Sequence, residues 1–329
     1  MTIYLLERLR KFFKSLGKKE LKIHDFIILK KFKEREKNFS LNFENFKPEI
    51  QVSEKVKIVA AISFFFDKNK IHNLKKVCNS LIEISKDVEI NIFTNHISED
   101  QKKALTENLK ENVEIIVIDN IVHNRLLPWY HLNLMKSLFK REDITHFIYL
   151  EDDILIDKNN FNYWVNSRKI LKKYNLIPGF VRTEVNELDN QLYAIDFVKK
   201  NYYQNLPRIT VNNYYSFVNH NYPYQGMYLY DRELMNEHLS GPSSNPDCGH
   251  GAYDTNYINP KMINLDLMAK ANIGLTYLNV PEGFFNRMVT LYNKSEKEID
   301  KNCQIKHLSN KYSNTKSWFG NIKVKDSIC

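Results

Sequence analysis

The chain has 329 residues, of which 43% are hydrophobic and 13% aromatic, so it can bury the core of one large domain or of two small ones. It contains no run of about 18 apolar residues, which argues against a membrane-spanning helix. Its four cysteines form no C-x-x-C pair, so we expect free thiols and neither a zinc site nor disulfide bonds. The net charge of +9 fits nucleic acid, an anionic lipid surface or a phosphate-bearing substrate, and only the position of the basic residues can separate these partners.

Residues 1–20 combine an apolar stripe at helical spacing with basic residues around it. The pattern predicts a cationic amphipathic helix that binds an anionic membrane surface, the body of the protein or a second subunit in a homo-oligomer. Glu7, Arg8 and Arg10 interrupt what would be the apolar core of a signal peptide, and no small-residue cleavage site follows. We therefore expect a cytoplasmic protein, peripheral at the inner face of the membrane if this helix binds lipid. Residues 23–54 show little period and are interpreted as a lead-in.

From residue 56 onward, apolar strands alternate with amphipathic helices. This alternation predicts a Rossmann-type, mostly parallel α/β sheet with right-handed crossovers and helices on its faces. The expected strands are 56–66, 88–93 and 113–118, and the expected helices are 70–84, 99–110 and 124–140.

The next strand, within residues 145–157, ends in three consecutive acids, Glu151, Asp152 and Asp153. A buried strand does not accept carboxylates for packing reasons, so something must neutralise them. Ligands of open α/β sheets collect at the carboxyl ends of the strands, where such acids suit a hard divalent cation that holds phosphate oxygens. Alternation places Glu151 and Asp153 on one face and Asp152 on the other. The alternative is an acidic junction exposed to solvent.

This strand with its acids and the following turn into a helix resembles the "DXD" element of glycosyltransferases with the GT-A fold. The resemblance implies a transferase that uses a nucleotide sugar, with Mn²⁺ or Mg²⁺ held against the diphosphate. The acceptor would be a glycan or a lipid-linked sugar in surface polysaccharide synthesis. Strings such as Leu-Glu-Asp-Asp and His-Leu-x-Asn-x-Tyr are similar to those of little-described GT-A-like bacterial and plant proteins. The chain departs from the strict motif because its first acid is Glu151.

The resemblance also implies roles for particular residues. Residues 1–54 would be the amphipathic helix and lead-in, 55–157 the nucleotide-sugar half and 158–329 the acceptor half of a GT-A-like domain. Contacts to the nucleotide sugar would come from Phe64, Thr94, Asn95, Glu151 and Asp152, although the first three could also belong to ordinary polar turns. The metal would be held by Asp153 and Glu151, with His307 as a late ligand that suits Mn²⁺. A lone histidine such as His307 is equally compatible with a structural role.

In the second half, we expect a helix at 161–171 capped by Asn159 or Asn160, followed by strands at 177–184 and 224–230. Residues 188–221, rich in Tyr and Asn, predict an excursion that covers the site and recognises the acceptor, or else an aromatic cluster that packs a loop. A further strand and turn are expected at 274–284.

Two acids are candidates for the base that deprotonates the acceptor hydroxyl if the enzyme inverts configuration. Asp254 follows a loop with two glycines around a histidine, where inverting GT-A enzymes keep a catalytic acid, although a helix cap would also explain it. Glu184, near the end of a strand, is the second candidate.

Two other classes of protein remain open. A nucleotidyltransferase also needs a cation on phosphates, but it would usually bring a glycine-rich loop after the first strand, and residues 64–70 contain no glycine. A basic nucleic-acid-binding protein would explain the charge, but the densest basic cluster lies beside an apolar stripe in residues 8–19 and no known binding motif appears. We therefore expect no nucleic-acid partner.

Overall fold

The structure is a computed structural model that describes residues 21–107, 109, 112–246, 265–315 and 318–329. The amphipathic helix expected at residues 1–20 and the candidate base Asp254 lie outside the described residues. Within these ranges, Cys78, Cys303 and Cys329 are free thiols, and none of the helices is long and apolar enough to cross a lipid bilayer.

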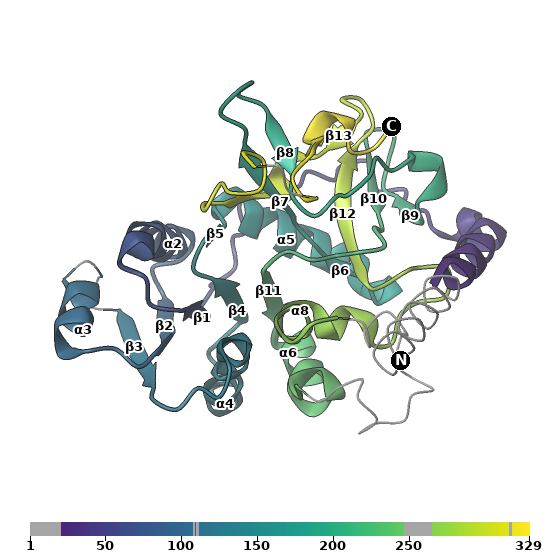
Figure 1. The fold of residues 1–329 in the computed structure, drawn as a ribbon. Coiled ribbons are helices and arrows are strands. Elements are labelled where there is room, and N and C mark those ends of the chain that lie inside the picture. The colour runs from purple at the N-terminus through teal and green to yellow at the C-terminus, as the bar shows by residue number, and fades with distance from the viewer. Residues whose placement is uncertain (1–20, 108, 110–111, 247–264, 316–317) are drawn as a thin grey trace, which may run out of the picture.

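A five-stranded sheet forms the centre of the molecule, with the order β11-β4-β1-β2-β3 (Figure 1). Strands β1 to β4 run parallel, and β11 joins the edge of β4 in the antiparallel direction. Every residue of β1 is buried, as its near-continuous apolar run, interrupted only by Ser63, predicts for a strand covered on both faces. The bounds are β1 Ile58–Phe64, β2 Val88–Asn95, β3 Val113–Ile118, β4 His146–Glu151 and β11 Met227–Asp231.

Helices cover both faces of this sheet, with α2 and α5 above it and α4 and α6 below it in Figure 1. Helix α2 buries Leu74, Cys78 and Leu81, spaced so that they form one apolar stripe. The bounds are α2 Ile71–Ile84, α3 Glu99–Thr106, α4 His131–Leu138, α5 Lys158–Leu171, α6 Arg232–Ser240 and α8 Leu267–Ile273. The predicted fold class is confirmed as a mixed α/β fold, in which helices flank a mostly parallel sheet.

Two smaller sheets complete the fold. One has the order β13-β12-β10-β9, with β6 also paired to β12, and the other has the order β15-β8-β7-β14-β5. In the second of these sheets, β14 runs parallel to β7 and antiparallel to β5, and β5 is the short strand that directly follows the three acids. The end of the chain is thereby brought beside the acidic turn. The bounds are β5 Ile154–Leu155, β6 Ile177–Pro178, β7 Val181–Val185, β8 Leu192–Ala194, β9 Arg208–Thr210, β10 Tyr215–Val218, β12 Met288–Asn293, β13 Glu298–Ile299, β14 Gln304–His307 and β15 Ile322–Lys323.

Several sequence-based expectations need correction. The helix expected at 124–140 is a 3₁₀ segment, Asn124–Trp129, followed by α4, because Pro128 cannot donate an amide hydrogen bond within a continuous α-helix. The expected strand at 274–284 begins instead as a 3₁₀ helix, Gly274–Tyr277, continuing from α8. The cap of α5 is Asp157, which forms a reciprocal capping box with Asn160.

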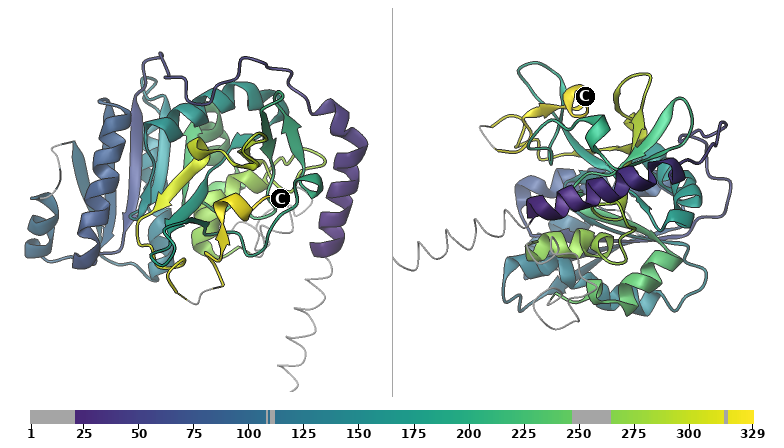
Figure 2. Two further views of the ribbon diagram at one scale, coloured as in Figure 1. Left: turned by 90° about the horizontal axis from the view of Figure 1, so that it is seen from above. Right: turned by 90° about the vertical axis from the view of Figure 1, so that its right-hand side faces the viewer.

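The lead-in expected at 23–54 also contains regular structure, because residues 21–35 form a helix on the outside of the molecule (Figure 2). Ile28 and Phe32 are buried on its inner face, and Phe32 makes an edge-to-face contact with Phe284. Gly283 has a φ of +92°, and a Cβ atom there would lie 3.0 Å from the backbone of Phe32. The glycine therefore allows the helix to approach the body this closely.

Candidate functional site

The three acids lie at the carboxyl end of β4, where residues from the second half of the chain contact them. Glu151 is the last residue of β4, and its Oε1 accepts hydrogen bonds from Tyr224 Oη at 2.6 Å and Asn272 Nδ2 at 3.2 Å. Gly226, with a φ of +66°, allows this arrangement, because a Cβ there would lie 3.2 Å from Glu151 Oε2. Burial raises the pKa of Glu151, opposed by the charge of Arg182.

Asp153 faces His307, which is the last residue of β14. His307 Nε2 lies 3.2 Å from Asp153 Oδ2, and His307 Nδ1 donates to Glu184 Oε1 at 2.5 Å. The ring of Tyr312 stacks on the imidazole with a centroid distance of 5.4 Å. The backbone amide of Leu308 donates to the carbonyl of Asp153 at 2.7 Å, which fixes the two segments to each other. The imidazole is thus held between two carboxylates.

The charged forms of Asp153, His307 and Glu184 stabilise one another. Burial alone would lower the pKa of His307, but hydrogen bonds to Asp153 and Glu184 raise it above its ordinary value. Burial would raise the pKa of Asp153 and of Glu184, but the hydrogen bond from His307 lowers both. These contacts therefore stabilise the buried ring in its charged form.

Asp152 and Asp153 form a turn directly after β4, so the alternation expected along a strand does not extend to them. Glu151 and Asp153 both line the main cavity of the site, whereas Asp152 does not. Among the described residues, its Oδ2 atom is buried without a hydrogen-bond partner. Burial and the neighbouring charge of Asp153 raise the pKa of Asp152 to about 7, and the charge of Lys70, which directly precedes α2, opposes this. A buried carboxylate in this state favours a polar or cationic ligand.

The cavity next to Glu151 and Asp153 has a volume of about 280 Å³. Arg182 and Asp196 lie in its wall as a buried ion pair, with Arg182 Nη2 2.7 Å from Asp196 Oδ1, and the guanidinium stacks 4.5 Å above the ring centroid of Tyr224. Lys311 adds a second cation. Further lining comes from Tyr222, Asp266, Met268, Ala269, His307, Tyr312 and Phe319.

The residues expected to contact the nucleotide are placed differently from one another. Phe64 has no exposed surface, because its ring lies in the core next to Phe66, so its side chain is not available to a ligand. Thr94 is also fully buried at the end of β2. Asn95 is half-buried, and its Oδ1 accepts a hydrogen bond from the amide of Phe66 at 2.7 Å. The near-continuous apolar run extends to Phe66, so the sequence could not indicate where the strand ends.

The structure gives Glu184 a different position from the one expected of a base. Its Oε2 accepts hydrogen bonds from the backbone amides of Tyr312 at 2.8 Å and Ser313 at 2.7 Å, while Oε1 accepts from His307. Both oxygens are occupied, the residue is buried, and it is not among the residues that line the cavity. Glu184 therefore contacts His307 on the side away from Asp153 and does not open onto this cavity.

Arg182 and Asp196, which line the cavity, were not identified from the sequence, whereas Glu184 was a candidate base. Arg182 and Glu184 are both charged and both buried in β7, whose residues are otherwise mostly uncharged. Charges two positions apart in a buried strand share one face, and they signal a polar centre on that face. The excursion expected at 188–221 reaches the cavity through Asp196, whereas β9 and β10 belong to the other small sheet.

The side chains of the site provide some of the ligands that a divalent cation needs. Within the described ranges, no group of three or more His, Cys, Asp and Glu side chains is arranged to hold a metal ion. Glu151 turns toward Tyr224 and Asn272, which leaves Asp153 and His307 as the adjacent pair. A carboxylate together with an imidazole whose other nitrogen is held by a second carboxylate is the arrangement common around transition metals in proteins. Asp153 and His307 therefore offer two donor groups to such an ion, and Glu151 lines the same cavity.

Comparisons with known proteins add little to this geometry. No protein-family model matches the sequence, and a search of curated proteins finds no significant match. Among solved structures, the chain is similar to the crystal structure of galactosyltransferase LgtC in complex with donor and acceptor sugar analogues, with 19% identity and a TM-score of 0.24. The match covers 33% of this chain and spans 42% of that one, too little to assign a function.

Proposed function

We propose that this protein is a metal-dependent glycosyltransferase of the GT-A type, which moves a sugar from a nucleotide sugar to a glycan or a lipid-linked acceptor in surface polysaccharide synthesis. The main support is the pairing of Asp153 with His307 at 3.2 Å, in a cavity that Glu151 also lines, beside the carboxyl end of a parallel strand. A carboxylate and an imidazole together suit Mn²⁺. Phosphate groups bind at this edge in open α/β folds.

On the donor side, Asp153 and His307 would hold the ion, and Glu184 keeps the imidazole oriented toward it. When bound, Mn²⁺ or Mg²⁺ would offset the negative charge that develops on the leaving nucleoside diphosphate. Asp152 and Lys70 lie on the other side of the acidic turn, where their opposite charges suit the ribose hydroxyls and the phosphates respectively.

On the acceptor side, the cavity offers aromatic rings and carboxylates of the kind that bind sugars. Tyr222 and Tyr224 are nearly parallel, with an interplanar angle of 14°, and Tyr312 and Phe319 also line the cavity. Aromatic faces stack on the apolar faces of sugar rings, and carboxylates accept hydrogen bonds from hydroxyls.

A base for the acceptor hydroxyl would come from Asp254 or from Asp266. Asp266 lines the cavity, and its Oδ1 accepts a hydrogen bond from the amide of Ala269 at 2.8 Å as the cap of α8. The other oxygen of Asp266 would be the one to take the proton in an inverting reaction. A retaining reaction would need neither residue.

Calorimetric titration with nucleoside diphosphates, in Mn²⁺, in Mg²⁺ and in a chelator, tests this proposal. We expect binding that depends on the metal and is lost in Asp153→Asn, which keeps the shape of the side chain but removes its charge. Asp157→Asn is a matched control, because Asp157 caps α5 outside the cavity and asparagine also caps helices. Nucleotide binding that is unchanged in chelator or in Asp153→Asn would remove the main support for a glycosyltransferase.

A further inference from the structure

The helix over residues 21–35 has two apolar faces, and only one of them is covered. Ile28 and Phe32 are buried against the body of the protein, whereas Ile23 and Phe26, on the outer face, are 61% and 68% exposed. Ile27, also exposed, extends this outer face, because residues three and four positions apart lie on the same side of a helix. Figure 2 shows the helix lying along the outer surface of the molecule. We call Ile23, Phe26 and Ile27 the outer stripe.

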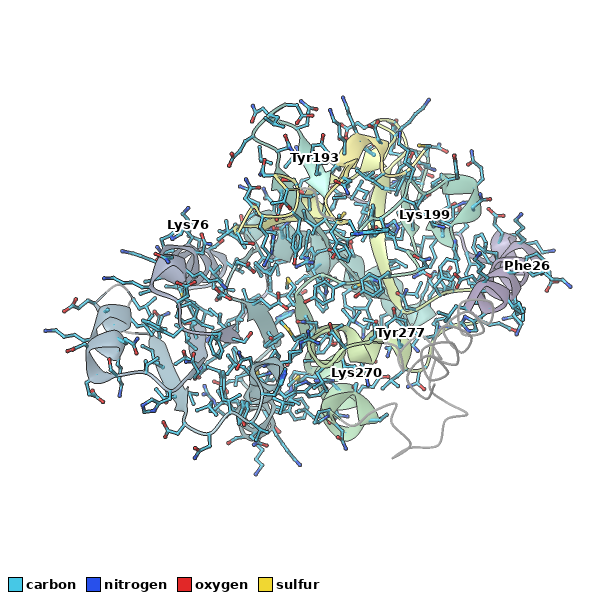
Figure 3. The ribbon with its side chains drawn as sticks, in the orientation of Figure 1. Phe26, Lys76, Tyr193, Lys199, Lys270 and Tyr277 are labelled. Carbon is cyan, nitrogen blue, oxygen red and sulfur yellow. The ribbon has the colours of Figure 1, made fainter. Side chains whose placement is uncertain are left out.

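A groove with a basic rim runs beside the outer stripe. Its volume is about 550 Å³, and it lies between the helix and residues 199–206. Lys22, Lys199 and Lys200 line it together with Phe26, Leu29 and Tyr202, and Asp25 is the acid among its described lining residues. Figure 3 shows Phe26 and Lys199 on the same side of the molecule. We call this feature the lysine groove.

The chemistry of these neighbouring features suits one kind of partner. Exposed apolar side chains that adjoin one another, unlike single scattered ones, mark an interaction site. Lysines near that apolar surface favour a partner that offers both hydrocarbon and negative charge. We propose that the outer stripe and the lysine groove dock on an anionic lipid bilayer, with the helix lying in the plane of the interface.

Charge favours a bilayer over a second copy of this chain. In a two-fold dimer the same patch meets itself, so the basic surface of Lys22, Lys199 and Lys200 would face the same basic surface of the other copy. Like charges brought together in this way oppose association. An anionic lipid surface instead complements the three lysines and accepts Phe26 and Ile23 among its acyl chains. This docking does not depend on the reaction that the protein catalyses.

Sedimentation of the full-length protein with vesicles tests the proposal. Vesicles of equal parts phosphatidylcholine and phosphatidylglycerol are compared with phosphatidylcholine alone. We expect binding to the anionic vesicles, and a loss of about tenfold in both Ile23→Ser/Phe26→Ser and Lys199→Glu/Lys200→Glu. All variants keep residues 1–20, so a loss cannot come from removing that segment.

Matched controls change the same residue types elsewhere. Val122→Ser/Leu188→Ser removes two exposed apolar side chains, and Lys75→Glu/Lys76→Glu reverses two exposed charges on α2, at the opposite end of the molecule from Phe26 in Figure 3. Both controls should bind vesicles as the unaltered protein does. Full vesicle binding by both test variants would overturn the proposal. So would a lipid-independent dimer that Ile23→Ser/Phe26→Ser abolishes, since the stripe would then join two copies.

Discussion

Glu184 Oε1 accepts a hydrogen bond of 2.5 Å from His307 Nδ1, although 123 residues separate the two in sequence. The other oxygen of Glu184 is held by two backbone amides, so this carboxylate cannot rotate without losing hydrogen bonds. The imidazole is consequently fixed with Nε2 toward Asp153. Glu184 thus affects the site by orienting His307, as carboxylates that accept a hydrogen bond from a metal-binding histidine do.

Glu184→Gln should weaken Mn²⁺ binding by about 10- to 100-fold while the protein remains folded. A glutamine oxygen cannot serve the imidazole and both amides together, so the free energy of unfolding should also fall by about 1–3 kcal/mol. Titration calorimetry and chemical unfolding measure the two effects, and nitrogen NMR of the His307 ring reports its tautomer. The exposed Glu187→Gln is the control. A ring signal unchanged in Glu184→Gln would show that Glu184 does not orient His307.

His307→Ala should weaken Mn²⁺ more than Mg²⁺, because a site of carboxylates without an imidazole still accepts the harder ion. Competition between the two ions in titration calorimetry gives the ratio of their affinities. The exposed His72→Ala is the control. Equal losses for both ions would mean that His307 shapes the pocket and is not a ligand.

Glu151→Gln should lower metal-dependent nucleotide binding less than Asp153→Asn does. Glu151 already has hydrogen bonds from Tyr224 and Asn272, whereas Asp153 faces His307 directly. Direct titration of both variants with Mn²⁺ and a nucleoside diphosphate compares them. A larger loss in Glu151→Gln would place the ion closer to β4 than we propose.

The contact between His307 and Asp153 should make stability depend on pH in a defined direction. Because the folded protein raises the pKa of His307 above 6.5, its stabilising effect is fully present below that value and is lost as the pH rises through the folded pKa. Mn²⁺ affinity should change in the opposite sense and increase with pH, since the ring must release the proton on Nε2. Chemical unfolding of the unaltered protein and of His307→Gln across this range provides the measurement. Identical slopes for the two proteins would contradict the assignment.

Asp266→Asn and Asp254→Asn should identify the base of an inverting reaction. Asparagine still caps α8, so Asp266→Asn removes the charge while the helix start is kept. The variant that lacks the base should lose about 10²–10⁴-fold in kcat with little change in donor affinity. Steady-state kinetics compares both with Asp100→Asn, an exposed control on α3. Equal and mild losses in Asp266→Asn and Asp254→Asn would favour a retaining mechanism.

The sheet and the acidic edge were accessible from sequence because their signals are local. A near-continuous apolar run predicts a buried strand such as β1, and three acids at the end of a strand stand out against the apolar residues around them. Alternation did not determine the position of Asp152, because Asp152 and Asp153 lie in the turn after β4.

Other features depend on contacts between distant segments, which periodicity does not report. In sequence, Glu184 is an acid near the end of a strand, and no local pattern indicates that the backbone amides of Tyr312 and Ser313 donate hydrogen bonds to its carboxylate. Leu275 and Tyr277 are buried in a 3₁₀ helix, but a short apolar run has the same appearance in a strand. The position of Phe64 was ambiguous for the same reason, because the run continues past the end of β1.

The late position of β14 in the sequence affects the order in which parts of the protein can fold. All strands of the central sheet have been synthesised once residue 231 is made, whereas the contacts that balance Asp153 require residues 304–313. A nascent or truncated chain that stops before β14 would therefore carry a complete central sheet with a buried acidic edge lacking the His307 contact. Because buried, unbalanced carboxylates disfavour compaction, the acidic turn should be among the last parts of the molecule to become rigid.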